Sequence, residues 1–182
     1  MFKLFASALV ALVAFAAPSA FAQDEGLKWD LTSRPTLAVQ LPGMSYHFQD
    51  PEATDRKWNE THLGIGIEWR SKWNDNDWVF KKSLGLMRDS VESWGAHGGL
   101  VWQKEFLPDS TTWSAALGPG LFAFYRALHF DGKREWLPAI LPVLSLEHRP
   151  SGFGLNVLYV PHFKTRDGEM PAVLFAQFTK RF

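Results

Sequence analysis

His47, Asp89 and Ser90 together supply an imidazole, a carboxylate and a hydroxyl, the groups that take part in hydroxyl activation. In such sites the imidazole accepts the hydroxyl proton, and a carboxylate orients the ring and stabilises its charged form. The acid and the hydroxyl are adjacent at the end of the stretch SLGLMRDS, whereas the histidine lies more than 40 residues earlier, in SYHF. A common site therefore requires a fold that brings these two stretches together.

The stretches that carry these residues have the pattern of β-strands. In HLGIGIEWR, residues 62–70, large apolar side chains at every second position alternate with glycine and charged residues. This alternation is typical of a strand with two different faces, and two interior glycines would each cost a helix about 1 kcal/mol. The same pattern predicts eight strands, at about 35–48, 62–71, 78–89, 93–106, 113–125, 136–148, 152–161 and 171–182.

The N-terminus predicts export. Residues 1–22 carry one cation, Lys3, then an apolar run and the small-residue pattern that ends at Ala22, which together indicate a signal peptide cleaved after that residue. An uncleaved anchor is the weaker alternative because the apolar run is short and an acidic stretch follows at once. We therefore expect residues 23–182 to form a single exported domain.

The composition of the chain excludes several kinds of stabilising site and partner. It has no cysteine, so neither disulfides nor thiolate metal sites stabilise it. The whole chain has 19 basic and 19 acidic residues, a balance that indicates no nucleic-acid partner. The 9 Trp and 15 Phe of the whole chain suit a protein whose surface meets an apolar solvent. The last predicted strand ends on the aromatic residue Phe182.

These features predict an all-β fold, an eight-stranded antiparallel transmembrane β-barrel of the outer membrane. No segment after residue 22 is apolar for the length that a spanning helix needs, so a membrane-spanning chain must close its strands into a barrel. A soluble, lipocalin-like periplasmic barrel would show similar alternation and is the alternative architecture. Such a soluble barrel would not need an aromatic residue like Phe182 at the end of its last strand.

The barrel topology predicts that the three reactive side chains lie at the same level of the barrel. If the first strand rises from the periplasm, its end and the end of the third strand both lie at the outer rim. His47, Asp89 and Ser90 then share one level. Adjacent strand residues face opposite sides, so Asp89 and Ser90 can both face the lumen only if the strand bulges or ends there.

Several short stretches add a family resemblance: SYHF, TDRKWNE, RDSVESW, LPAILP and LYVP, in this order and spacing. Over nearly all of its mature length the chain resembles the PagP family, the outer-membrane lipid A palmitoyltransferases. The resemblance implies an eight-stranded barrel whose lumen holds an acyl chain, with a phospholipid donor, a lipid A acceptor and no cofactor. It implies the bacterial outer membrane as location and His47, Asp89 and Ser90 as catalytic residues, and we expect a monomer or a homodimer.

The resemblance also predicts how lipids reach the lumen and how long their chains are. It places Pro42, Pro142 and Pro161 beside gaps in the wall through which lipids pass sideways. Alternation in WGAHGGLVWQK directs Gly99 and Val101 to the lumen, and Val101 stands where the family uses glycine as the floor of its acyl pocket. We therefore expect an acyl chain of palmitoyl length or somewhat shorter.

Two other functions fit parts of the sequence. A lipid A deacylase barrel would also use His and Ser, but the His-x-Ser-Asn signature of that family is absent. A small structural or adhesion barrel would fill its lumen with a dense polar network, whereas glycines at 64, 66, 85 and 99 favour an apolar cavity. The histidines lack metal-ligand spacing, so we expect no metal.

Overall fold

The structure is a computed structural model that describes residues 36–49, 57–73, 77–128, 130, 132–165 and 168–182. Every regular element in this part of the chain is a β-strand. Within the same residues, no helix has the length and hydropathy to cross a membrane. The predicted signal peptide and the segment up to Pro35 lie outside the described residues.

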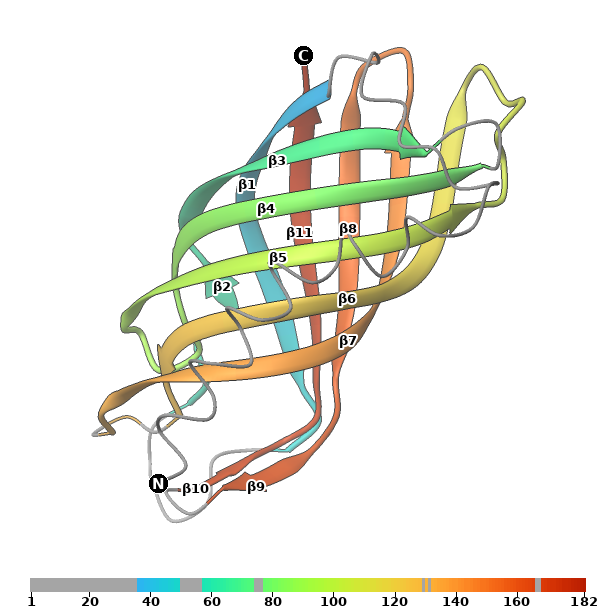
Figure 1. Cartoon of the computed structure of the whole chain (residues 1–182). Coiled ribbons are helices and arrows are strands. Elements are labelled where there is room, and N and C mark those ends of the chain that lie inside the picture. Colours follow the sequence, from blue (N-terminus) through green and yellow to red (C-terminus); the bar gives the residue numbers. More distant parts are fainter. Residues whose placement is uncertain (1–35, 50–56, 74–76, 129, 131, 166–167) are drawn as a thin grey trace.

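All the described strands except β9 and β10 form one antiparallel sheet that closes on itself (Figure 1). Each strand pairs with the next along the wall, and β11 pairs back with β1. The short β2 is separated from β3 by Leu63 alone and belongs to the same part of the wall, so the described chain forms a closed barrel of eight strands, as predicted. The bounds of the wall strands are β1 Thr36–His47, β2 Thr61–His62, β3 Gly64–Trp73, β4 Trp78–Arg88, β5 Trp94–Glu105, β6 Trp113–Ala127, β7 Arg134–His148, β8 Phe153–Val160 and β11 Val173–Arg181.

The wall separates an apolar exterior from a mixed lumen because side chains alternate along each strand. On β4, Leu84 and Leu86 face outward and are 58% and 56% exposed, while Lys81 on the other face is buried. The outer surface is therefore apolar, as the exterior of a membrane barrel is. Other large apolar side chains exposed there are Ile65, Trp94, Trp113, Trp136, Ile140, Phe153, Leu174 and Phe178.

A bulge at Pro42 changes which residues of β1 face the lumen. Ala38 and Gln40 are buried before it, and Gly43, Ser45 and His47 after it, so the alternation shifts by one residue. The pairing with β11 is irregular at the same place, between Gln40 and Gly43. Proline lacks a backbone N–H, which favours such an interruption. The shift directs the last residue of β1, His47, into the lumen.

A second interruption lies between β7 and β8. The two strands pair only from Val143 with Leu158 to His148 with Phe153, so residues 134–142 of β7 have no partner on β8. Pro142 stands at the limit of this pairing, and Pro161 follows the last residue of β8. On the other side of β7, Pro142 lies opposite Pro119 of β6. The wall therefore lacks β7–β8 backbone pairing over the half of the barrel nearer β9 and β10 (Figure 1).

A short hairpin, β9 Phe163–Thr165 and β10 Gly168–Met170, occupies the connection between β8 and β11, where no strand was predicted. Met170 is buried in a cluster with Leu128 and Val173, against which Phe163 packs. The hairpin lies at the end of the barrel where β1 ends (Figure 1). It thus contributes apolar side chains to that end of the lumen.

Candidate active site at the barrel rim

His47 and Ser90 lie in direct contact. His47 is the last residue of β1, and Ser90 follows the end of β4. The imidazole Nε2 is 3.0 Å from the Ser90 hydroxyl oxygen, and both residues are buried. The structure therefore brings together two side chains that are 43 residues apart. A contact of this kind lets the ring accept a proton from a hydroxyl.

Asp89 supports the turn that carries Ser90. The strand β4 ends at Arg88, so Asp89 and Ser90 both point inward and are buried. The Asp89 Oδ1 accepts the backbone N–H groups of Val91, at 3.0 Å, and Ser93, at 2.8 Å. Its Oδ2 is buried and has no hydrogen-bond partner among the described residues. The contacts of the described residues include none between this carboxylate and the His47 ring.

A second histidine connects the two strand ends. The His62 ring lies 2.8 Å from the Ser45 hydroxyl through Nε2 and 2.8 Å from the Arg88 carbonyl through Nδ1. Sequence reasoning did not select His62 or Ser45. A signal for Ser45 was available, because it lies two residues before His47 and so shares its face of the strand. Nothing comparable in the sequence indicates that His62 belongs to the site, because the position of this residue depends on the break between β2 and β3.

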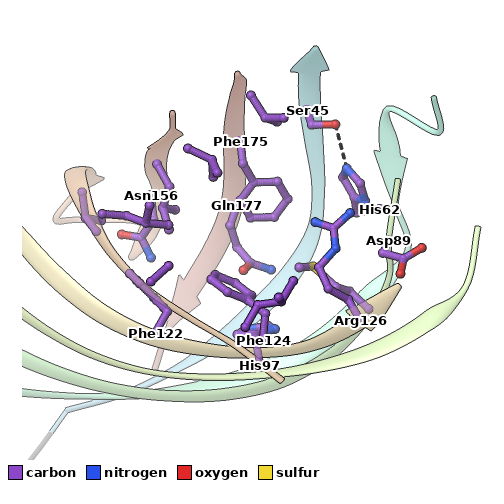
Figure 2. Close-up of a pocket in the computed structure, with 18 of the residues that line it drawn as sticks. Ser45, His62, Asp89, His97, Phe122, Phe124, Arg126, Asn156, Phe175 and Gln177 are labelled. Atoms are coloured by element: carbon purple, nitrogen blue, oxygen red, sulfur yellow. Dashed lines mark hydrogen bonds between the residues drawn. The ribbon is translucent and has the colours of Figure 1, made fainter. Parts of the chain in front are cut away.

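A cavity of about 430 Å³ lies in the lumen and reaches Ser90. Figure 2 shows side chains that line it. Most of its wall is apolar, and its central cluster joins Val101 of β5 to side chains of three other strands. Near the rim, Arg126 extends toward His62 and Asp89 (Figure 2), and its Nη2 has no hydrogen-bond partner among the described residues. The apolar lining includes Phe122, Phe124, Leu141, Val143, Leu158 and Phe175.

The residues predicted to bind substrate do not all line this cavity. Val101 lines the cavity. Gly99 does not: a β-carbon there would stand 2.5 Å from the ring of Phe122, so the absence of a side chain makes room for Phe122. Pro161 lines the cavity, whereas Pro42 and Pro142 are exposed and lie beside interruptions of the wall.

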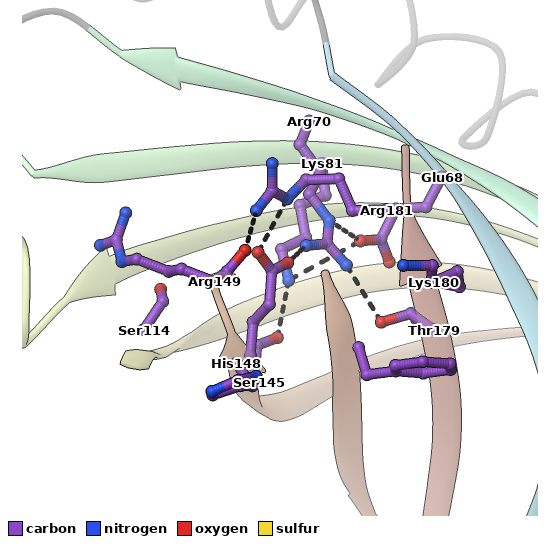
Figure 3. Close-up of polar contacts among 12 residues, drawn as sticks. Glu68, Arg70, Lys81, Ser114, Ser145, His148, Arg149, Thr179, Lys180 and Arg181 are labelled. Carbon is purple, nitrogen blue, oxygen red and sulfur yellow. Dashed lines mark hydrogen bonds and ion pairs between the residues drawn. The ribbon is translucent and has the colours of Figure 1, made fainter. Parts of the chain in front are cut away.

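Polar and charged side chains fill the opposite half of the lumen (Figure 3). The buried Lys81 ammonium donates to Ser145, at 2.7 Å, and to Asn156, at 3.3 Å. Glu68 lies 2.5 Å from Arg70, which also pairs with Glu147. A second cavity of about 220 Å³ lies here, and Lys81 and Asn156 line both cavities. The lumen thus combines the predicted apolar cavity with the polar network expected of a structural barrel.

The fold and the site define a class of protein: a closed eight-stranded β-barrel whose lumen holds a largely apolar cavity that reaches Ser90, the contact partner of the buried His47. A protein family described as "Antimicrobial peptide resistance and lipid A acylation protein PagP" matches residues 30–178. The chain belongs to the PagP family.

Comparisons with individual proteins add little. No curated protein matches the chain. Among solved structures, the chain is similar to Ail, the attachment invasion locus protein of Yersinia pestis, solved in complex with the heparin analogue sucrose octasulfate. The identity is 16%, the TM-score is 0.38, and the match covers 81% of this chain and 97% of Ail.

Proposed function

We propose that this protein is an acyltransferase of the outer membrane that moves an acyl chain of palmitoyl length, or somewhat shorter, from a phospholipid to lipid A in the outer leaflet. Membership of the PagP family supports the acceptor and the reaction class. The observation that carries the proposal is the contact between His47 and Ser90 at one end of an apolar lumenal cavity. A cavity of this kind can hold a hydrocarbon chain while the ester group at its end stays at the rim.

The reaction exchanges one ester for another. The acceptor hydroxyl attacks the carbonyl carbon of the donor ester and loses its proton, and the lysophospholipid oxygen leaves and gains one. His47 Nε2 can take the first proton and return it to the leaving oxygen, because it lies within hydrogen-bond distance of a hydroxyl position. The Ser90 hydroxyl lies beside this nitrogen and can donate a hydrogen bond to the donor carbonyl oxygen, which gains negative charge in the transition state.

The interruption between β7 and β8 supports sideways movement of lipid into the lumen. A closed barrel wall normally excludes lipid because each strand is hydrogen-bonded to both neighbours. Residues 134–142 of β7 have no β8 partner, and Pro142 cannot donate a backbone hydrogen bond. An acyl chain could pass here without breaking backbone pairs between these strands.

Mass spectrometry of lipid A tests the proposal. Lipid A from cells that produce the protein should gain the mass of one acyl chain, and cells that produce His47→Ala should not show this gain. Purified protein given a phospholipid with an isotope-labelled acyl chain should transfer the label to lipid A. An unchanged lipid A mass with folded protein in the membrane would exclude the function, and loss of an acyl chain would indicate a deacylase instead.

A further inference from the structure

The His47 ring uses one of its two nitrogens in the contact with Ser90, and the surroundings of the other nitrogen are different. Nε2 lies 3.0 Å from the serine hydroxyl oxygen. Nδ1 is buried and has no hydrogen-bond partner among the described residues. A buried polar group without a partner is unfavourable, so the environment of Nδ1 affects which form of the ring is stable.

The group near Nδ1 therefore decides whether His47 can act as a base. A neutral imidazole carries its proton on one nitrogen and accepts at the other. Nε2 can accept a proton from a hydroxyl only if Nδ1 carries the ring proton. An acceptor placed at Nδ1 favours this tautomer, and without one the ring can place its proton on Nε2 and donate to Ser90 Oγ.

Glu60 provides the carboxylate at this position. Its Oε1 lies 3.9 Å from His47 Nδ1, and the same oxygen lies 3.5 Å from the backbone nitrogen of His47. The distance to Nδ1 is longer than a hydrogen bond, so direct contact requires rotation of the glutamate side chain, which is half exposed. Asp89, the carboxylate next to Ser90, instead accepts two backbone N–H groups of its own turn.

The backbone on either side of Glu60 is fixed to both strand ends of the site. The Glu60 carbonyl accepts the N–H of Ser45, at 2.9 Å, which ties it to β1. The neighbouring Asn59 donates its backbone N–H to the Ser90 carbonyl, at 2.8 Å, and its side-chain amide to the Asp89 carbonyl, at 3.0 Å. The position of the Glu60 backbone therefore depends on the same two strand ends that bring His47 and Ser90 together.

Trp58 limits the movement of the ring. Its indole stacks on the His47 imidazole, with ring centroids 5.0 Å apart and an angle of 14° between the planes, and its Nε1 donates to the Gln49 carbonyl. The imidazole is thus held in a plane with Ser90 on one edge and Glu60 on the other. This is the order of contacts in a hydroxyl, imidazole and carboxylate series.

We propose that Glu60 is the positioning residue for His47: its carboxylate accepts a hydrogen bond from Nδ1–H, keeps Nε2 free to accept a proton, and stabilises the ring when Nε2 becomes protonated. The inference rests on the proposed acyl transfer, in which Nε2 is the proton acceptor. Glu60 acts through His47 and does not itself touch the reacting atoms. Its side chain is 52% exposed, so we expect it to contribute little to the stability of the barrel.

Steady-state kinetics of acyl transfer test this role. Glu60→Gln and Glu60→Ala should lower kcat roughly 10- to 100-fold, because the ring loses its charged partner, while KM changes less than about twofold. Glu60→Asp keeps a carboxylate and should recover part of the lost kcat. Glu92→Gln is the matched control, since Glu92 is a more exposed rim glutamate that pairs with Arg88 and should keep wild-type kcat. Wild-type kcat in both Glu60→Gln and Glu60→Ala, or a change in KM alone, would overturn the inference.

Nitrogen-15 spectra of labelled histidine give a second measurement that does not need substrate. The His47 signals, assigned from their absence in His47→Ala, should show the proton on Nδ1 in the wild type and on Nε2 to a larger extent in Glu60→Ala. A wild-type ring protonated mainly on Nε2, or no change in Glu60→Ala, would contradict the role of Glu60. If wild-type protein transfers no acyl chain but shows the expected tautomers, the proposed function fails and the positioning contact stands.

Discussion

Lys81 of β4 and Val101 of β5 are direct cross-strand partners and both point into the lumen. Val101 belongs to the apolar cluster of the cavity, whereas the Lys81 ammonium donates to Ser145 and Asn156. The apolar and polar halves of the lumen therefore meet at the level of this pair. A hydrocarbon chain that enters from the rim would reach charged groups just beyond Val101, where burying its end against them is unfavourable.

Val101→Gly should shift the chain-length preference toward longer acyl groups by only a few carbons. The substitution removes the apolar side chain at this level, but Lys81 and its partners stay in place. Discrimination of one methylene in a tight pocket is worth about 1–3 kcal/mol, so the shift should be visible when phospholipids of graded chain length compete. Leu100→Gly, on the lipid-facing side of the same strand, is the control. An identical product profile for wild type and Val101→Gly would place the floor elsewhere.

His47→Ala and Ser90→Ala should each lower the rate of acyl transfer by about 10² or more while the barrel still folds. Both residues lie at the end of a strand, so their removal leaves the wall pairing intact. The measurement is transfer of a labelled chain to lipid A, with heat-modifiable gel mobility to verify folding. Full activity in either variant would remove that residue from the mechanism.

Substitutions of Asp89 separate its charge from its hydrogen bonds. Asp89→Asn keeps one side-chain oxygen that can accept the N–H groups of Val91 and Ser93, whereas Asp89→Ala keeps none. If the carboxylate acts by holding the turn, Asp89→Asn should retain at least tenfold more transfer activity than Asp89→Ala, a difference of about 1.4 kcal/mol. Equal loss in both variants would show that the negative charge itself is needed.

A disulfide across the interruption between β7 and β8 should block lipid access. Pro142→Cys with Tyr159→Cys would join the strands one residue beyond their last paired residues, Val143 and Leu158. Leu144→Cys with Val157→Cys is the matched control, because these residues are already cross-strand partners. Oxidation should reduce transfer in the first pair and not in the second, and reduction should restore it. Unchanged turnover in the oxidised first pair would exclude this route.

Glu68→Gln should destabilise the barrel strongly. Glu68 is buried and contacts Arg70, Lys81 and Asn156, so removal of its charge leaves buried cations short of a partner. Loss of one member of a buried ionic network costs about 3–5 kcal/mol in the free energy of unfolding. Urea unfolding followed by tryptophan fluorescence measures this cost. Glu92→Gln at the rim should change stability by less than about 0.5 kcal/mol, and a similarly small effect at Glu68 would contradict the role of the network.

The strand order and most strand bounds could be predicted from sequence because two-residue alternation is a direct consequence of strand geometry. The predicted strand at 136–148, for example, is β7, Arg134–His148. The β9–β10 hairpin was not predicted, because each of its strands has only three residues, too few for alternation to show. The break at Leu63 was not predicted either, since it depends on how the distant β1 offers hydrogen bonds to β2. A local pattern contains no information about that pairing.

Part of the candidate site could be predicted, because strand geometry determines where strand ends lie. Topology placed His47 and Ser90 at one rim, and their contact follows from strand ends that meet there. The position of Glu60 depends on backbone bonds from Asn59 to the turn after β4, which no spacing in the sequence indicates. Likewise, Gly99 was expected to leave space for a ligand, but the space is filled by Phe122, whose direction depends on neighbouring strands.

Closure of the wall by β1 and β11 has a consequence for how the protein folds. His47 pairs with Val173, so the strand that carries the His47 imidazole obtains its second neighbour only from the last part of the chain. Contacts between such distant residues form slowly, because the loop-closure entropy is lost before the contact is gained. An incomplete chain would expose two unpaired edges that can recruit strands from other molecules. Activity and protection against aggregation should therefore appear together, in the last step of assembly.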